Sequence, residues 1–241
     1  MNLIKPAGKL ETSPLRMLIV VALVLVVGPF TLLLVDVLRD GPLVAIDTQI
    51  ANRLNAYNAE HNVAFEAARV VTRLGSTGVL TAVTIVGAAV LTMIRKRRQA
   101  LFLITTALLG SGLNNLVKVV VGRDRPHFDT ARVTALGKSF PSGHAMNAAV
   151  VYGVLLILFS PRLHTRRRRI GAVANTSLLV ALIAASRVVL TVHYVSDVVA
   201  GITLGVALVC ISTAAFAPWR DGGGHLREAT KTTLNTIEPV T

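Results

Sequence analysis

The chain has 241 residues, enough for one domain or at most two, and its single cysteine, Cys210, excludes a disulfide scaffold and a cysteine metal cluster. Apolar residues make up 53% and charged residues 15% of the chain, whereas about 25% of a typical soluble protein is charged. With a formal net charge of +13, this composition argues against a disordered chain, a collagen-like chain and an ordinary cytosolic enzyme, and it favours a membrane protein over a nucleic-acid-binding one.

Six apolar runs are long enough to cross a membrane as helices. A helix rises about 1.5 Å per residue and a hydrocarbon core is about 30 Å thick, so roughly 20 apolar residues suffice. The runs are residues 17–38, 77–94, 100–121, 145–160, 171–190 and 196–217. Because lipid cannot hydrogen-bond the backbone, each run is expected to be helical. The predicted fold class is an all-α polytopic membrane protein, with one membrane-embedded domain over residues 1–241.

The connection between the first two runs, residues 39–76, has the spacing of amphipathic helices. Apolar side chains recur at steps of three and four at Leu43, Ile46, Ile50 and Leu54, and again between residues 63 and 74. Polar residues lie between them. One or two amphipathic helices at the membrane surface are therefore expected here.

The basic residues predict the orientation of the chain. The two densest basic clusters, residues 95–98 and 166–169, lie on the same side of the membrane as the N-terminal residues 1–16 and the polar tail 218–241. Basic segments tend to stay in the cytoplasm. Both termini of this multi-pass protein are therefore predicted to be cytoplasmic, with the connection 39–76 on the outer side of the cell membrane.

Three polar clusters lie at the ends of the runs on the predicted outer side. They are Lys118 with Arg125, then Ser142, Gly143 and His144, and then Arg187, His193 and Asp197. Ionisable groups at membrane depth are costly, so each cluster marks a candidate functional site. The orientation rests mainly on other residues, yet it brings all three clusters to one face.

The cations among these residues indicate a phosphate site. Lys118, Arg125 and Arg187 would repel one another without an anion, and Asp197 supplies only one negative charge. Phosphate suits this set because arginine forms forked hydrogen bonds with its oxygens and lysine adds a point charge. The fourth run begins beside Gly143, where free backbone N–H groups favour an anion and the missing side chain allows a close approach.

The histidines indicate a reaction beyond binding. His193 and Asp197 are four residues apart, so they share a face if the segment is helical. A carboxylate on one ring nitrogen fixes the tautomer and leaves the other nitrogen free to attack. His144 is separate in the sequence and can donate a proton to the leaving oxygen. The set therefore predicts in-line phosphoryl transfer.

The pattern K-x(6)-R-P over 118–126, P-S-G-H over 141–144 and S-R-x(5)-H-x(3)-D over 186–197 resembles the three signatures of the type 2 phosphatidic acid phosphatase family. Any one motif alone would be weak, but the three in order are highly specific. The resemblance implies an enzyme that needs no metal and no other cofactor. It implies that the phosphate is held by Lys118, Arg125, Ser142, Gly143 and Arg187. It further implies that His193 forms a phosphohistidine, Asp197 orients it and His144 protonates the leaving group.

The expected function is that of a membrane phosphatase acting on a lipid-linked phosphate or diphosphate at the outer face. The preferred substrate is an undecaprenyl-type polyprenyl diphosphate. The reasons are the substrates common in the family that the chain resembles and the predicted outward orientation of the site. Phosphatidate and phosphatidylglycerophosphate are the alternatives. A non-catalytic lipid-phosphate binder or transporter is disfavoured because both histidines and the aspartate are present. A vanadate-dependent oxidase is disfavoured by the membrane setting. The expected partners are the lipid substrate and membrane lipids, without nucleic acid.

Four polar residues flank the candidate site in the connection after the third run: Arg123, Asp124, His127 and Asp129. We interpret them as solvated loop residues. The alternative is contact with a second phosphate or a head group, which would suit a diphosphate.

Overall fold

The computed structural model describes residues 14–129 and 132–235, with side chains for all of these except 14–23, 25–26 and 217–235. Within these ranges the chain is helical and contains no strand, which confirms the predicted all-α class. The α-helices are α1 (Pro14–Leu38), α2 (Pro42–Glu60), α3 (Asn62–Thr72), α4 (Thr77–Met93), α5 (Arg97–Val121), α6 (Gly143–Phe159), α7 (Arg166–Val189) and α8 (Val195–Asn235). Two short 3-10 turns, η1 (Arg73–Gly75) and η2 (Ser160–Arg162), follow α3 and α6.

Five of the six predicted runs correspond to membrane-spanning stretches of the described chain. Five stretches of the described chain are long and apolar enough to cross a membrane: Asn62–Met93, Arg97–Val121, Gly143–Arg162, Arg166–Val189 and Val195–Phe216. The first of these joins α3 to α4. The predicted first run corresponds to α1, in which Val27–Leu38 is a shorter apolar helix. The chain is therefore a multi-pass membrane protein.

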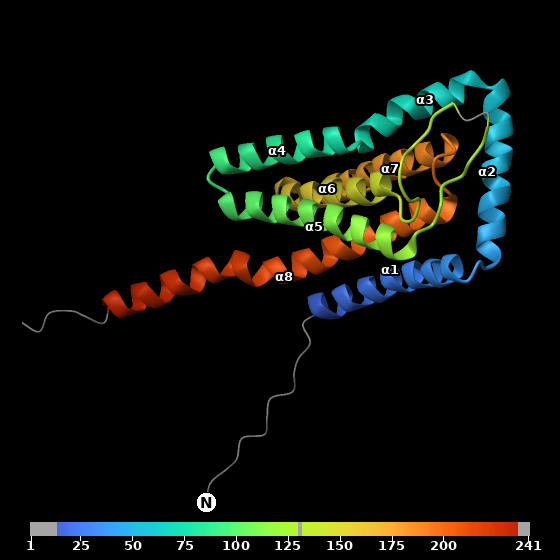
Figure 1. Ribbon diagram of the computed structural model, residues 1–241. Helices are drawn as coiled ribbons and strands as arrows, with labels where there is room; N and C mark the ends of the chain where they lie inside the picture. The colour runs from blue at the N-terminus through green and yellow to red at the C-terminus, as the bar shows by residue number, and fades with distance from the viewer. Residues whose placement is uncertain (1–13, 130–131, 236–241) are drawn as a thin grey trace, which may run out of the picture.

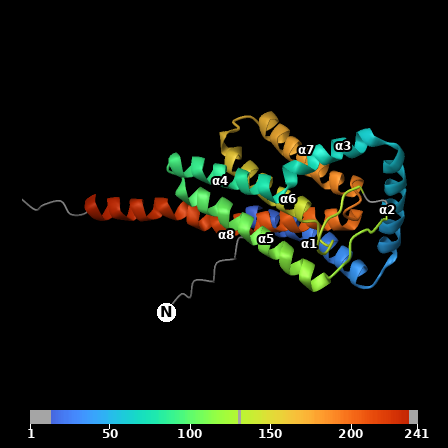
Figure 2. The ribbon, with the colours of Figure 1, turned by 45° about the horizontal axis from the view of Figure 1, so that its top comes forward.

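The bundle has one end that is crossed by α2 (Figure 1). Helices α1 and α4 to α8 run alongside one another, and a second view shows the same arrangement (Figure 2). At the end crossed by α2, α5 and α7 finish and α6 and α8 begin. The three polar clusters therefore all fall at this end, and the basic clusters 95–98 and 166–169 fall at the opposite end.

The buried face of α2 differs from its apolar stripe. The side chains that α2 buries are those of Asp47, Ala51 and Asn58. Leu43 and Ile46 of the predicted apolar face are instead 39% and 50% exposed. The connection 39–76 thus contains the expected helices, but α2 meets the bundle through polar groups, because these find hydrogen-bond partners there.

Close contact between α6 and α8 depends on two glycines. A Cβ at Gly201 would lie 2.7 Å from the carbonyl oxygen of Ser142, and a Cβ at Gly205 would lie 2.8 Å from that of Met146. The four-residue spacing puts both glycines on one face of α8, which is typical of membrane helices that pack backbone to backbone. The start of α8 is thereby pressed against the start of α6, where the second and third clusters lie.

The first cluster is positioned by the end of α5. Gly122 has a φ of +65°, in the left-handed region that glycine favours, and its N–H donates to the carbonyl oxygen of Lys118 over 3.0 Å. This is a common way to end a helix. It turns the chain after Lys118 so that Arg123 and Arg125 lie over the end of the bundle.

Candidate active site

His193 and Asp197 form a buried pair at the junction of α7 and α8. His193 lies in the turn between these helices and Asp197 in the first turn of α8. His193 Nδ1 is 3.3 Å from Asp197 Oδ2, and the two side chains are 2% and 0% exposed. Burial lowers the pKa of His193 to about 4, although Asp197 opposes this shift. The imidazole is therefore neutral at neutral pH.

Arg125 lies against the second ring nitrogen of His193. Its Nη1 is 3.0 Å from His193 Nε2 and 2.7 Å from the carbonyl oxygen of Val192, and its Nε donates to the carbonyl oxygen of Gly137 over 2.9 Å. A guanidinium can only donate, so Nε2 accepts, and the proton of the neutral ring is assigned to Nδ1, which donates to Asp197. This tautomer leaves the Nε2 lone pair directed at the cationic cluster.

Lys118 and Arg187 are held by groups on neighbouring segments. Lys118 Nζ donates to the carbonyl oxygens of Lys138 and Ser139 over 2.6 and 3.3 Å. Arg187 Nη1 donates to Thr72 Oγ1 over 2.8 Å, whereas its buried Nε has no hydrogen-bond partner among the described residues. Within the described side chains, neither cation is paired with a carboxylate, so both charges are available to an anion.

Ser142 is the N-cap residue of α6 and lies between the clusters. Its backbone N–H donates to the carbonyl oxygen of Asp197 over 2.9 Å. Its hydroxyl is buried and finds no hydrogen-bond partner in the described part of the chain. A Cβ on Gly143 would lie 3.1 Å from Asn114 Oδ1 of α5, which is closer than most Cβ contacts. The glycine therefore also allows α5 and α6 to pack here, which the sequence did not reveal.

His144 lies in the first turn of α6 and completes the set. The backbone of Gly75 packs against its ring, because a Cβ there would lie 3.4 Å from His144 Cδ2. The cationic groups that act on His144 are those of Arg187, Arg125 and Lys118. The structure thus brings together every residue that the sequence placed in the site.

The interpretation of Arg123 as a solvated loop residue is wrong. Its side chain is 9% exposed, and its Nη1 lies 2.7 Å from both Ser196 Oγ and Asp197 Oδ1. Its Nη2 lies 2.9 Å from Asp47 Oδ2, and the guanidinium lies 4.1 Å from the ring centre of Tyr194. No local signal could have linked Asp47 to Arg123, because 76 residues separate them.

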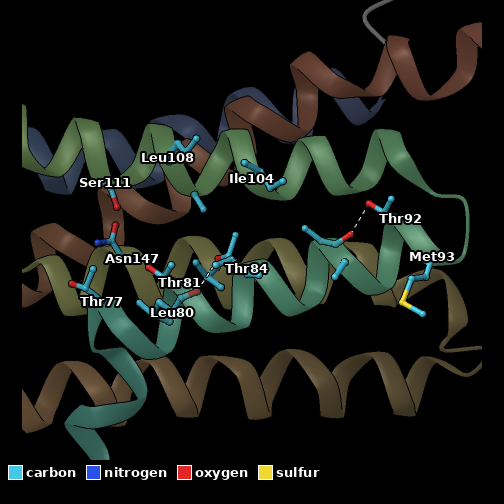
Figure 3. A pocket seen from close by; sticks show the side chains of 15 residues that line it. Thr77, Leu80, Thr81, Thr84, Thr92, Met93, Ile104, Leu108, Ser111 and Asn147 are labelled. Carbon is cyan, nitrogen blue, oxygen red and sulfur yellow. Dashed lines mark hydrogen bonds between the residues drawn. The ribbon is translucent and has the colours of Figure 1, made fainter.

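A largely apolar groove runs between α4 and α5, and Asn147 of α6 lies at one end of it (Figure 3). The cavity has a volume of about 670 Å³. Its lining includes the aliphatic side chains of Leu80, Ile85, Ile104 and Leu108. One end of the groove is lined by the polar side chains of Thr77, Ser111 and Asn147. Asn147 is one turn beyond His144 on α6, so the groove leads from the polar cluster into the membrane-spanning part of the bundle.

Known proteins share this region of the chain. Residues 99–221 match the family model described as the PAP2 superfamily, and this stretch contains all of the predicted site residues. The chain belongs to the PAP2 superfamily. The match confirms the resemblance drawn from the three motifs.

The relatives of this PAP2 chain are lipid phosphatases. Phosphatidylglycerophosphatase B from Bacillus subtilis is 33% identical over 141 residues, which are 57% of this chain and 68% of that protein. Lipid A 1-phosphatase from Rhizobium etli is 32% identical over 127 residues, which are 46% of this chain and 50% of that protein, so the match spans about half of its length.

Solved structures support the same assignment. The crystal structure of a transmembrane PAP2-type phosphatidylglycerolphosphate phosphatase from Bacillus subtilis matches with a TM-score of 0.72 at 26% identity, over 80% of this chain and 94% of that chain. The structure of Aquifex aeolicus LpxE matches with a TM-score of 0.54 at 25% identity, over 70% of this chain and 95% of that one. The PAP2 chain described here is therefore a membrane-bound lipid phosphatase.

Proposed function

We propose that this phosphatase cleaves a lipid phosphate through a phosphohistidine on His193. The observation that carries the proposal is the direction of the His193 ring, with Nδ1 on Asp197 and Nε2 facing Arg125. In the first step Nε2 attacks phosphorus, the bond from phosphorus to the lipid oxygen breaks, and His144 gives its proton to that oxygen. In the second step water attacks the phosphohistidine, His144 takes a proton from the water, and phosphate leaves with His193 restored.

The surrounding donors support a phosphate ligand. Lys118, Arg125 and Arg187 supply three positive charges, which suits a phosphate dianion and the charge that develops in the transition state. Ser142 Oγ and Arg187 Nε are buried donors that the described chain does not use. Buried polar groups normally have partners, and phosphate oxygens would provide them.

The substrate that we place first is a lipid phosphate monoester of the phosphatidylglycerophosphate class. The names of the Bacillus subtilis relatives support this choice. So does the pairing of the remaining cations in the connection between α5 and α6. Arg123 is bound to two carboxylates, Arg132 lies 3.7 Å from Glu66, and Lys138 lies 2.7 Å from Asp124. Their charges are already balanced, which argues against a dedicated site for a second phosphate.

A polyprenyl diphosphate of the undecaprenyl type is the second candidate. The groove between α4 and α5 has a volume of about 670 Å³ and mostly apolar walls, which suit part of one long isoprenoid chain. For either lipid, one hydrocarbon chain would lie in the groove and the phosphate at the outer end of the bundle, with both termini in the cytoplasm.

Phosphate release by purified protein in detergent tests the proposal. Phosphatidylglycerophosphate, phosphatidate and undecaprenyl diphosphate are assayed side by side with EDTA present. His193→Ala should abolish release, and His164→Ala, which changes an exposed histidine outside the site, should not. Labelled phosphate should remain bound to wild-type protein denatured in alkali and be absent from His193→Ala.

Each arm has an outcome that contradicts the proposal. A folded wild-type protein that releases phosphate from none of the lipids would refute the phosphatase assignment of this chain. Activity of His193→Ala near the wild-type level would remove His193 as nucleophile. Activity that is lost in EDTA and restored by magnesium would contradict a metal-independent reaction.

A further inference from the structure

Arg123 connects two buried carboxylates behind the His193 pair. It donates to Asp197 Oδ1 from one nitrogen and to Asp47 Oδ2 from the other. The side chains of Asp47 and Asp197 are 4% and 0% exposed. The chain His193–Asp197–Arg123–Asp47 therefore runs from the proposed nucleophile to α2 without passing through the phosphate-binding residues.

Asp47 also contacts Ser196, the neighbour of Asp197 in the sequence. Its Oδ1 accepts from the backbone N–H of Ser196 over 3.1 Å, and its Oδ2 accepts from the Ser196 hydroxyl. Ser196 is the residue before Asp197 at the start of α8, where a carboxylate also interacts favourably with the helix dipole. Asp47 thus holds Asp197 from both sides, through its side-chain partner Arg123 and through its backbone neighbour.

The contacts on Asp197 divide between its two oxygens. Oδ1 accepts from Arg123, and Oδ2 accepts from the backbone N–H of Tyr194 over 3.0 Å and from His193 Nδ1. With Oδ1 anchored, the carboxylate cannot rotate away from the imidazole. When Nε2 bonds to phosphorus the ring gains positive charge, and a carboxylate fixed at Nδ1 stabilises it.

We propose that Arg123 is a positioning residue for the reaction and that Asp47 on α2 holds it in place. The inference rests on the proposed function, in which His193 is the nucleophile. Stability alone is a weak reason for the cluster, because the attraction within a buried ion pair roughly offsets the free-energy cost of removing both charges from water. The docking of α2 on the bundle is, on this proposal, part of the assembly of the catalytic pair.

Steady-state kinetics of three variants test the proposal. Asp47→Asn keeps the shape of the side chain and removes its charge, whereas Arg123→Gln removes the guanidinium. Both should lower kcat by about 10- to 100-fold, the range found for residues that orient metal-binding histidines through hydrogen bonds, with KM changed less than about threefold. Arg123→Lys keeps the charge and should recover part of the loss.

Two further measurements are the kcat of a double variant and the rate of phosphoenzyme formation in a single turnover. The double variant of Asp47 and Arg123 should be no slower than the worse single variant, because both act through one chain of contacts. Formation of the phosphoenzyme in a single turnover should slow by the same factor as kcat. Glu66→Gln is the matched control, because Glu66 also joins an outer helix to the connection between α5 and α6 through Arg132, but at an exposed site. It should retain wild-type kcat.

The outcomes separate this inference from the proposed function. A wild-type protein without phosphatase activity refutes the function itself. Wild-type activity together with unchanged kcat in Asp47→Asn, and in Arg123→Gln where it folds, refutes the positioning role alone. A rise in KM at constant kcat would also overturn it, because that would mean that Arg123 acts on the substrate. If Arg123→Gln does not fold, Asp47→Asn decides the question.

Discussion

The contact at Gly201 makes a prediction that links helix packing to catalysis. A Cβ added at Gly201 would lie 2.7 Å from the Ser142 carbonyl oxygen and 3.2 Å from the Met146 backbone nitrogen. Both atoms belong to the backbone at the start of α6, so neither can rotate away. Gly201→Ala should therefore push α8 and α6 apart at the level of the site.

The size of the effect follows from these distances. Ordinary Cβ contacts begin at 3.4 Å, so the backbone must retreat by about 0.7 Å. Overpacking of this kind typically costs about 1–3 kcal/mol of stability. The shift also moves Ser142 relative to Asp197, and because a misplacement of about 1 Å can cost about 100-fold in rate, we expect kcat to fall about tenfold or more.

Thermal unfolding in detergent and kcat for lipid phosphate are the two measurements. Gly205→Ala is the first control, since it creates a similar clash one turn further from the site, 2.8 Å from the Met146 carbonyl oxygen. It should lower Tm as Gly201→Ala does but reduce kcat less. Gly112→Ala on α5 is the second control, because nothing lies within 4 Å of its Cβ position. It should raise stability by about 0.5–1 kcal/mol.

Two results would refute this reasoning. If Gly201→Ala keeps both the wild-type Tm and the wild-type kcat, the two helices do not pack backbone to backbone. If Gly201→Ala and Gly205→Ala lose kcat equally, the loss reflects general destabilisation, and the register of α8 against Ser142 does not matter for the reaction.

The remaining predictions concern the site and the topology. Ser142→Ala removes a buried hydroxyl without a described partner, so Tm should not fall. If the hydroxyl donates a hydrogen bond to a charged phosphate, worth about 1.5–3 kcal/mol, kcat/KM should drop about 10- to 100-fold. Unchanged kcat/KM would exclude that contact. Asp197→Asn should lower kcat by about 10² to 10⁴, and an unchanged kcat would remove Asp197 from the site. Because burial lowers the pKa of His193 to about 4, kcat/KM should fall only as the pH drops toward about 4. The same shift affects the free energy of unfolding, because the histidine of the unfolded chain binds a proton at about pH 6.5 and the buried histidine does not. Stability that is present above about pH 6.5 should therefore be lost between about pH 6.5 and 4. A pH–rate profile with its acid limb near about 6.5 would contradict the burial of His193. A reporter fused to the C-terminus should report the cytoplasm, and an external signal would invert the predicted orientation.

The sequence by itself determined the class of the protein and most of the site. Apolar run lengths predicted the membrane-spanning helices, because lipid imposes a local rule on every segment that crosses it. The three motifs identified residues such as Lys118, His144 and His193, because each motif lies within a short stretch of chain at the end of a helix. The three motifs come together in the site because the helices that carry them end or begin on the same side of the membrane.

The tertiary structure alone decided how that site is supported. Asp47 and Arg123 meet across 76 residues, and no periodicity or motif links two single side chains at that separation. The apolar spacing of α2 did not reveal how this helix meets the bundle, because the contact is made by Asp47, whose partners Arg123 and Ser196 lie far away in the sequence. The groove between α4 and α5 likewise exists only once the helices are packed, since its walls come from side chains that the sequence places in separate runs.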